Sequence, residues 1–583
     1  MIKRETTVNT SSPTTQSLFL QSVIAFLVYT AITLVFHAGV LGNLTNNVIG
    51  EVWDHQLYLW DAWWMSQSLF RGENPFFSNM VYAPEGTPLI LHTLVPLPAA
   101  AIALLGFSMS TELAYNLIVL AAFPLSGMAA YLLCRRFTRD HISSLCGGLV
   151  FMLSPFMVSK SVAGWVNLLY AGLLPLFFLT LLKATDQKGS RRASLQLALM
   201  TLIVLFTSEM LTVFAANIAV FTLGWRIWKS TDRRGTFRRL VHSLLPSAVA
   251  ASPFLALLIY YVATYSLPTE VDRRLTYCPD FISYFFPLSI TSIHSGWVFG
   301  DPVKTFPPVT TTANFPHVTK PDLAVYLGIL VAPLSLAGLF LRRNETEIRL
   351  CLLLFAAFFV LSFGPVLLIE REMVRVLGVP VVLPFAAWMF IPGLGAIAQS
   401  GRYLVISYAA MAVGFACLAS IIRARTPRFQ GYIYVAVLAL IVCTDYGFRT
   451  WVSPLPNVPT LSSSEGSVLD PRLRSGYPMY YQTRHGRPLI GGYLSRTPPR
   501  PMERYRAVPG MDCLFFGNRN ADCSRDAIYH AVNQLKVRDV MLGPRDWRNN
   551  LMRQLGFERR YSDQFTTVWS VPLSVPATAA KAQ

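Results

Sequence analysis

Charged residues are scarce in this sequence of 583 residues: they make up 14% of it, whereas hydrophobic residues make up 53%. The mean hydropathy of +0.43 indicates more apolar surface than a soluble core of this size needs. Several uncharged apolar segments reach the ~20 residues that a membrane-spanning helix requires. The scarcity of charge therefore excludes an ordinary soluble protein and predicts a mainly α, polytopic helical membrane bundle.

Acidic residues are fewer than basic ones, 31 against 49, which gives a formal net charge of +18. In a soluble protein this excess would indicate nucleic acid or another anionic partner. Here Lys and Arg collect in short loops between apolar segments, as expected of cytoplasmic connections. No basic face interleaved with exposed aromatics stands apart from those loops, so we expect no nucleic-acid partner.

The eight cysteines form no CxxC pair and no Cys/His spacing suited to zinc. No motif requires a cofactor, and no ligand cluster decides for or against a divalent metal. Cys513 and Cys523 lie in the polar C-terminal part of the chain. They could form a disulfide if that part lies outside the cytoplasm, or remain two free thiols.

The distribution of positive charge predicts the topology. We expect a cytoplasmic tail at 1–17, a transmembrane domain at 18–447, an exoplasmic α/β domain at 448–575 and a disordered tail at 576–583. A secretory signal peptide is the alternative for 18–40, but this run is longer than a usual signal-peptide core and lacks a clear cleavage site.

About eleven spans are expected in the transmembrane domain. They are 18–40, 112–134, 143–158, 165–183, 193–208, 210–228, 240–262, 323–341, 350–369, 402–421 and 430–447. Outer loops are expected at 41–111, 263–321 and 370–401.

Two further apolar segments, 89–107 and 377–398, should not cross the membrane. If they did, the basic segments 135–141 and 423–428 would face outward, against the positive-inside rule. Both segments contain several prolines, which interrupt a straight helix. We expect interfacial or re-entrant elements on the outer side.

The polar C-terminal part has a mixed pattern. Residues 526–535 and 549–556 have the spacing of amphipathic helices, whereas 537–543 and 565–571 resemble strands. The alternation predicts a small α/β domain.

The loop from 50 to 97 concentrates acids, histidines and tryptophans next to the first span. Asp54, in WDHQLYLWDAWW, stands among aromatics that can anchor a short helix at the membrane surface. A partly desolvated carboxylate there could deprotonate a hydroxyl or bind a metal. The alternative is a helix cap with an aromatic belt as simple anchorage.

This loop, with D-x3-Y-L-W-x2-W-W followed by GENPFFS and YAPEGT, resembles the first outer loop of bacterial polytopic GT-C-class glycosyltransferases. That superfamily includes protein O-mannosyltransferases, oligosaccharyltransferases and the aminoarabinose transferase of lipid A. Similar stretches continue along the chain at 130–140, 325–339, 383–405 and 480–496. The resemblance implies a GT-C-like fold and transfer of a sugar from a polyprenyl-phosphate carrier to an acceptor on the outer face.

The resemblance also implies roles for single residues. The first-loop acid of the family corresponds to Asp54, as catalytic base or acceptor-positioning group, and Glu51 is the second catalytic candidate. The departing phosphate needs cations. Expected substrate-binding residues are His92, Glu209, Arg402, Arg273 and Arg274. A structural histidine is the alternative for His92, and an ordinary interfacial loop acid is the alternative for Glu209. Lys160 and Asn167 are weaker candidates for contacts with the lipid phosphate, and an arginine that snorkels to the interface is the alternative for Arg402.

The implied partners are a lipid-linked sugar donor, a glycan, lipid or protein acceptor, and membrane lipids. The implied location is the bacterial inner membrane, with the N-terminus in the cytoplasm. Two other functions remain open: a glycolipid transporter or flippase, and a catalytically inactive scaffold. Intramembrane ionisable residues would favour transport. The acids here lie in expected outer loops, which favours the enzyme.

Overall fold

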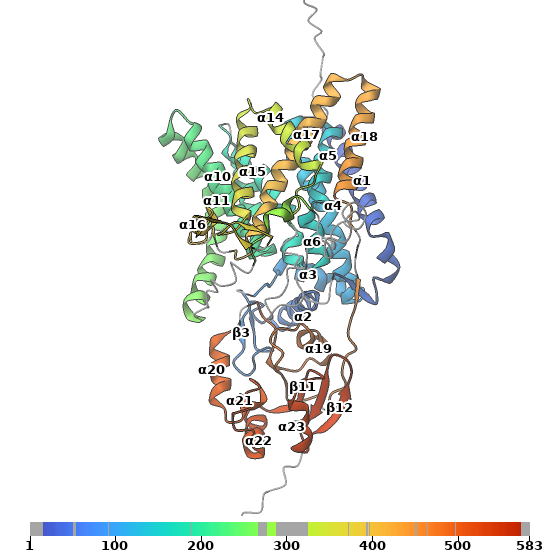
Figure 1. The fold of residues 1–583 in the computed structure, drawn as a ribbon, viewed down its shortest axis with the longest axis vertical. Coiled ribbons are helices and arrows are strands. Elements are labelled where there is room, and N and C mark those ends of the chain that lie inside the picture. Colours follow the sequence, from blue (N-terminus) through green and yellow to red (C-terminus); the bar gives the residue numbers. More distant parts are fainter. Residues whose placement is uncertain are drawn as a thin grey trace, which may run out of the picture.

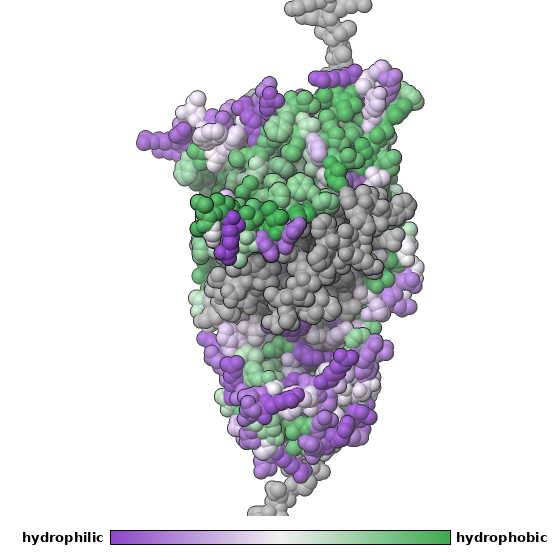
Figure 2. All heavy atoms as spheres, viewed as in Figure 1, coloured by the Kyte–Doolittle hydropathy of each residue, from purple (hydrophilic) through white to green (hydrophobic). Residues whose placement is uncertain are grey.

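The computed structural model describes residues 15–572 except 51–53, 91, 188, 266–276, 287–324, 371, 392–393, 396, 449, 451, 463 and 496. A bundle of helices forms the upper part in Figure 1, and a smaller α/β region formed by residues 452–572 lies at one end of it. The surface of the bundle is largely hydrophobic in Figure 2, whereas the C-terminal region carries many hydrophilic residues. Residues 1–14 of the expected tail at 1–17, the expected tail at 576–583 and most of the outer loop at 263–321 lie outside the described residues.

The bundle contains helices of very different length. They are α1 (Thr15–Phe36), α4 (Thr111–Thr138), α5 (His141–Met152), α6 (Pro155–Val162), α7 (Val166–Leu169), α8 (Leu173–Thr185), α9 (Arg191–Thr207), α10 (Glu209–Lys229), α11 (Arg233–Tyr265), α14 (Val331–Leu341), α15 (Thr346–Ser362), α17 (Leu404–Arg425) and α18 (Arg428–Asp445). Among the described residues, six segments are long and apolar enough to cross a membrane, or seven if the α5–α6 pair, bent by 42°, is one span. The count of about eleven spans stays a prediction.

Helix α17 lies at the centre of the bundle. In its segment 83% of the most apolar stretch is buried inside the protein, whereas in α11 the buried share is 11%. Helix α17 packs against α4, α5, α14 and α15. The contact with α14 requires small residues, because a Cβ atom added to Gly338 would lie 1.9 Å from the backbone oxygen of Gly414. The periphery, including α1 and α11, exposes apolar side chains as a surface in contact with lipid requires.

The two proline-rich apolar segments do not form long helices. In the first, α3 (Pro96–Gly106) has 11 residues. The second begins in the second of two small hairpins, which are β4 (Leu368–Ile369) with β5 (Glu372–Met373) and β6 (Arg375–Val376) with β7 (Val379–Pro380). It continues with α16 (Phe385–Trp388), a helix of four residues. Their interfacial position stays a prediction.

The C-terminal region contains a five-stranded sheet of order β10-β9-β11-β13-β12. Its strands are β9 (Ser467–Asp470), β10 (Leu489–Gly491), β11 (Val537–Leu542), β12 (Glu558–Ser562) and β13 (Thr567–Ser570). Strands β10, β9 and β11 are parallel, while β13 is antiparallel to both β11 and β12. The surrounding helices are α19 (Tyr477–His485), α20 (Pro499–Ala507), α21 (Met511–Leu514), α22 (Arg525–Gln534) and α23 (Arg548–Gln554). The expected helices at 526–535 and 549–556 and strands at 537–543 and 565–571 are confirmed.

Cys513 and Cys523 form a disulfide with a Cα–Cα distance of 5.4 Å. The sequence left this pairing open. A disulfide persists in oxidising compartments, which supports an outward position for the C-terminal region.

The first loop joins the C-terminal region to the bundle. Within it, α2 (His55–Arg71) is followed by a hairpin of β2 (Phe77–Ser78) and β3 (Thr87–Pro88), and before it β1 (Asn47–Ile49) pairs with β8 (Val452–Pro454). The short helices η1 (Ala38–Asn43), η2 (Phe281–Tyr284) and η4 (Ser400–Tyr403) complete the described elements.

Candidate functional site

Asp54 lies at the junction of the bundle and the C-terminal region. It occupies the N-cap position of α2, yet its side chain makes no capping hydrogen bond. Instead, one carboxylate oxygen accepts a hydrogen bond of 3.0 Å from the hydroxyl of Tyr493, which follows β10 in the C-terminal region. The half-buried carboxylate therefore does not serve as a helix cap, which was the alternative for this residue.

Asp54, Tyr58 and Asp61 are spaced i, i+4 and i+7, so they share one face of α2. The Tyr58 hydroxyl donates a hydrogen bond of 2.8 Å to the side-chain oxygen of Asn167 on α7. The carboxylates of Asp54, Asp61 and Glu209 all act electrostatically on Tyr58. Helix α2 thus presents two acids, and Glu209 at the start of α10 adds a third.

Asp61 is fully buried, and neither of its carboxylate oxygens has a hydrogen-bond partner among the described residues. Burial and the nearby charge of Glu209 raise the pKa of Asp61 well above 3.8. Its neighbour is His92, whose Nε2 lies 3.7 Å from Oδ1 of Asp61. Burial lowers the pKa of His92 to about 3, which favours a neutral imidazole, so we do not describe this contact as an ion pair.

His92 connects Asp61 to the same segment that holds Asp54. Its Nδ1 accepts a hydrogen bond of 3.2 Å from the backbone N–H of Ser495, so the ring proton of the neutral imidazole lies on Nε2, facing Asp61. The Ser495 hydroxyl also pairs with the Thr93 hydroxyl at 2.9 Å. The acid that the structure places beside His92 is therefore Asp61.

Two buried cations contact one indole near these acids. The guanidinium of Arg402, on η4, lies 4.9 Å from the ring centre of Trp165, and the ammonium of Lys160, on α6, lies 4.7 Å from the same indole. Arg402 also donates to the sulfur of Met210, the residue after Glu209, at 2.9 Å. With exposures of 6% and 2%, neither Arg402 nor Lys160 snorkels to the surface.

The structure brings together four of the expected residues: Asp54, His92, Glu209 and Arg402. Glu51, Arg273 and Arg274 lie outside the described residues. Asp61 and Tyr493 were not among the candidates from the sequence, and Lys160 was a weaker one. The spacing of Asp54, Tyr58 and Asp61 on one helix face was the signal that could have identified Asp61. No group of three or more potential metal ligands occurs in the part of the chain that the structure describes.

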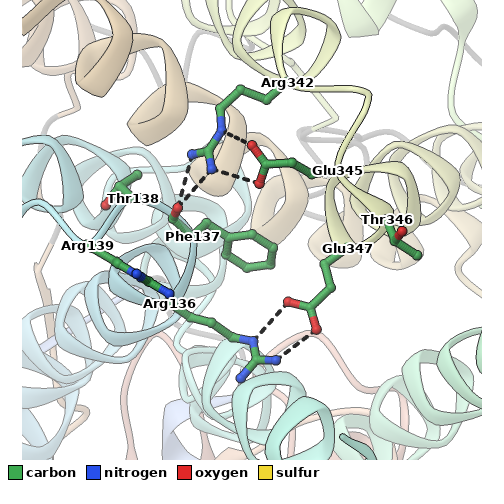
Figure 3. Close-up of a pocket in the computed structure, with 8 residues that line it drawn as sticks. All are labelled: Arg136, Phe137, Thr138, Arg139, Arg342, Glu345, Thr346 and Glu347. Carbon is green, nitrogen blue, oxygen red and sulfur yellow. Dashed lines mark hydrogen bonds and ion pairs between the residues drawn. The ribbon is translucent and has the colours of Figure 1, made fainter. Parts of the chain in front are cut away.

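Two cavities stand out, and neither is lined by Asp54. One of about 130 Å³ lies beside α2 and α3, where Arg484 of the C-terminal region pairs with Glu112 at the start of α4. The larger, of about 480 Å³, opens at the other end of α4 (Figure 3). The candidate site is therefore identified by the chemistry and contacts of its side chains and not by either of these cavities.

Comparison with known proteins gives a family match and a shared fold. Residues 94–300, less than half of the chain, match a family described as a 6-pyruvoyl-tetrahydropterin synthase related domain, membrane protein. No curated protein matches the chain.

Solved structures give the fold. The archaeal oligosaccharyltransferase AglB from Archaeoglobus fulgidus, in complex with an inhibitory peptide and a dolichol-phosphate, aligns with a TM-score of 0.50 at 12% identity over 89% of this chain and 69% of AglB. The same enzyme tethered to an acceptor peptide containing the NVT sequon aligns with a TM-score of 0.50 at 12% identity over 95% and 74%. ArnT from Cupriavidus metallidurans in the apo state gives a TM-score of 0.45 at 10% identity over 95% and 98%. The expected GT-C-like fold is confirmed by the similarity to AglB.

Proposed function

We propose that this chain is a membrane glycosyltransferase that transfers a sugar from a polyprenyl-phosphate carrier to an acceptor at the membrane surface. The acceptor would bind on the side where the C-terminal region lies. The GT-C-like fold supports the reaction class, since AglB has been solved with a dolichol-phosphate and a peptide. The observation that carries the proposal is the position of Asp54, whose carboxylate is held by Tyr493 rather than used as a helix cap.

In the proposed reaction the acceptor hydroxyl oxygen attacks the anomeric carbon of the carrier-linked sugar. The bond between this carbon and the phosphate oxygen breaks, and the phosphate leaves with the electron pair. The acceptor proton passes to the Asp54 carboxylate. Tyr493 would orient this carboxylate, and Glu51 is the second acid proposed for the same loop.

The cations Lys160 and Arg402 would stabilise the charge on the departing phosphate. Both are buried against Trp165, and Met210 links Arg402 to the end of α10 that carries Glu209. The proposed reaction needs positive groups for the departing phosphate and an acid for the acceptor hydroxyl. Arg273 and Arg274 remain proposed additional phosphate contacts.

The test uses purified full-length protein with a panel of undecaprenyl-phosphate-linked hexoses and pentoses, and it measures both sugar transfer and release of undecaprenyl phosphate. We expect Asp54→Asn to lose at least about a hundredfold in rate, because the amide cannot accept the acceptor proton. Glu73→Gln, which changes an exposed acid just beyond the same helix, is the matched control.

Full activity of Asp54→Asn would contradict the role of Asp54. Movement of the glycolipid across a vesicle membrane without bond cleavage would instead indicate a transporter. Absence of both activities with every donor would indicate a scaffold.

A further inference from the structure

The cavity of about 130 Å³ lies where the C-terminal region meets the bundle. Its walls are one face of α2, the end of α3 with the first turn of α4, and α19. The lining positions on α2, from Leu59 to Ser66, lie on a different face of this helix from Asp54 and Asp61. None of the acids and cations of the candidate site lines the cavity. It is therefore a separate cavity that shares α2 with that site.

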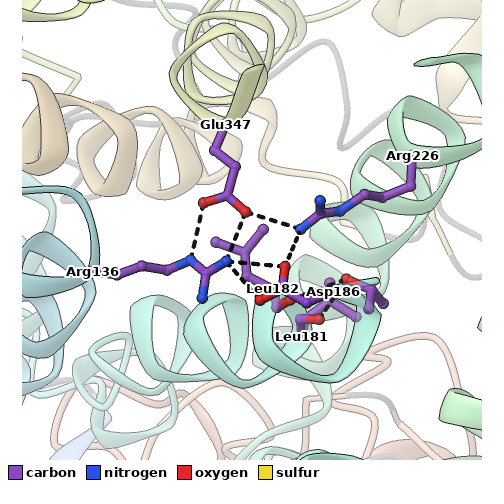
Figure 4. Close-up of polar contacts among 7 residues, drawn as sticks. Arg136, Leu181, Leu182, Asp186, Arg226 and Glu347 are labelled. Carbon is purple, nitrogen blue, oxygen red and sulfur yellow. Dashed lines mark hydrogen bonds and ion pairs between the residues drawn. The ribbon is translucent and has the colours of Figure 1, made fainter. Parts of the chain in front are cut away.

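Helix α4 relates this cavity to the membrane. Its first turn carries Glu112, which lines the cavity, and its last turn carries Arg136, which belongs to a ring of ion pairs with Asp186, Arg226 and Glu347 (Figure 4). The helix is apolar enough to span a membrane, and its 28 residues extend over ~40 Å at 1.5 Å per residue. This length matches a bilayer with its headgroups, ~40–45 Å. The cavity therefore lies at the level of the lipid headgroups, on the side of the C-terminal region.

An apolar rim adjoins the cavity. Phe107, directly after α3, lines the cavity and is 68% exposed, and Leu104, in the last turn of α3, is exposed to the same extent. Between them, Gly106 also lines the cavity. Exposed apolar side chains at the level of the headgroups are covered by the acyl chains of lipids. A ligand of this cavity can therefore carry an acyl chain.

The charges at the cavity cancel. The guanidinium of Arg484 pairs with the carboxylate of Glu112, and it also lies 5.5 Å from the ring centre of Tyr480 and 3.4 Å from the hydroxyl of that tyrosine. Glu112 is buried, with an exposure of 6%. An anionic headgroup would thus meet a buried carboxylate beside the one guanidinium that lines the cavity. This balance favours a neutral ligand.

Uncharged polar groups and aromatic rings line the same cavity. The indole N–H of Trp63 and the hydroxyls of Ser66 and Thr111 have no hydrogen-bond partner among the described residues. The hydroxyl of Thr483 donates to the carbonyl of Tyr480 at 2.7 Å and can still accept a hydrogen bond. The rings of Trp63 and Tyr480 provide two aromatic surfaces. A sugar ring has hydroxyls around its rim and C–H groups on its faces, so it can use both kinds of group.

The volume of the cavity suits one sugar ring. About 130 Å³ is several times the ~10–15 Å³ that one water molecule needs, and it is below the ~300–1,000 Å³ of sites for larger ligands. We propose that this cavity binds the single neutral sugar of a membrane glycolipid, whose acyl chains lie along Leu104 and Phe107. The bound lipid lies against α2, the helix that begins after Asp54. This binding requires no step of the transfer reaction proposed above.

The experiment adds monoglucosyl diacylglycerol to the delipidated full-length protein in a polyoxyethylene detergent, which carries no sugar, and counts bound lipid by native mass spectrometry. Ser66→Leu should weaken binding at the tightest site at least about tenfold, because the larger side chain fills the space of the sugar. The Ser66 hydroxyl has no hydrogen bond to a described residue that the change would break. The matched control is Ser252→Leu, at an exposed position of α11. Thermal unfolding of each variant verifies that it is folded.

A second variant, Trp63→Leu, tests the aromatic surface. It should weaken binding about fivefold, because the leucine cannot offer a ring face to the sugar. Its matched control is Trp228→Leu, a change of a tryptophan on α10 that is 60% exposed and does not line the cavity. Both controls should bind the glycolipid as the parent does.

Two further lipids test the choice of headgroup. Diacylglycerol, which lacks the sugar, and phosphatidylglycerol, whose headgroup is anionic, should both bind to the parent at least about tenfold more weakly than the glycolipid. Binding of either lipid as strong as that of the glycolipid would overturn the proposal. Equal binding of the glycolipid by the parent, Ser66→Leu and Trp63→Leu would overturn it as well. None of these measurements depends on sugar transfer, so the proposed reaction can fail while this site holds.

Discussion

At the residue scale, two aspartates on one helix face have opposite environments. Asp54 is half-buried and hydrogen-bonded by Tyr493, whereas Asp61 is fully buried beside His92. A carboxylate that must accept a proton needs to be ionised, and a buried acid without donors favours its neutral form. We therefore propose Asp54 rather than Asp61 as the base, with Asp61 and His92 as positioning residues behind it.

The raised pKa of Asp61 gives a pH-dependent prediction. Its folded pKa is raised above the usual 3.8, so its contribution to the free energy of unfolding is fully present below about pH 3.8 and is lost as pH rises through the folded pKa. The loss is about 1.4 kcal/mol per pH unit within that window. Asn cannot titrate, so the apparent unfolding temperature of Asp61→Asn relative to the parent should rise between pH 5 and pH 8.

The exposed acid Asp526, in the first turn of α22, supplies the control for this measurement. Asp526→Asn should follow the parent at both pH values. A difference between Asp61→Asn and the parent that stays constant from pH 5 to pH 8 would show that Asp61 is ionised in the folded protein.

At the element scale, the first loop completes the edge of the C-terminal sheet. The N–H groups of Tyr82 and Ala83 donate to the carbonyls of Gly491 and Leu489 at 3.0 and 2.9 Å, and Leu489 donates to Met80 at 2.8 Å. Strand β10 is otherwise an edge strand, which offers unpaired backbone groups. Pairing across this edge fixes α2, and with it Asp54, relative to Tyr493.

Gln482 on α19 reinforces this junction. It is fully buried, accepts a hydrogen bond of 2.7 Å from the Trp60 indole, and donates to the carbonyls of Met80 and Arg487 at 2.6 and 2.9 Å. Gln482→Leu should destabilise the protein by about 1–3 kcal/mol for each polar group left without a partner. Limited proteolysis should then release the C-terminal region earlier than in the parent.

Gln534→Leu, at an exposed position of α22, is the matched control and should behave as the parent. An unchanged proteolysis pattern and unfolding temperature in Gln482→Leu would mean that the junction does not depend on this side chain.

At the scale of the whole molecule, the polar C-terminal region and the basic turns lie at opposite ends of an apolar bundle. The disulfide between Cys513 and Cys523 and the positive-inside rule both predict an outward C-terminal region. A cysteine introduced at the exposed Glu503 on α20 should therefore react with an impermeant thiol reagent added to intact cells. A cysteine introduced at the exposed Arg234 near the start of α11 should react only after permeabilisation.

The reverse pattern of labelling would invert the topology and move the proposed acceptor site to the cytoplasm. The parent protein is the background control, because the described free cysteines are buried or half-buried.

The sequence by itself determined the features that depend on local composition. Apolar windows, basic turns and helix or strand periodicity need only neighbouring residues, so they predicted a helical membrane protein and the C-terminal helices and strands. The resemblance to GT-C-class glycosyltransferases indicated Asp54 as the principal acid, which stays a prediction. The spacing that places Asp61 on the same face was also present.

Only the tertiary structure decided the contacts between residues far apart in the chain. Three examples are the hydrogen bond between Asp54 and Tyr493, the meeting of Lys160 and Arg402 at Trp165, and the ion pairs of Arg136 and Arg226 with Asp186. They join segments separated by 40 to more than 400 residues. Such contacts leave no periodic signal in one sequence, because they depend on how the helices pack and on which sheet edge remains open. The contacts within the candidate site are therefore decided by packing, whereas the sequence alone indicated the first loop as the place to look for it.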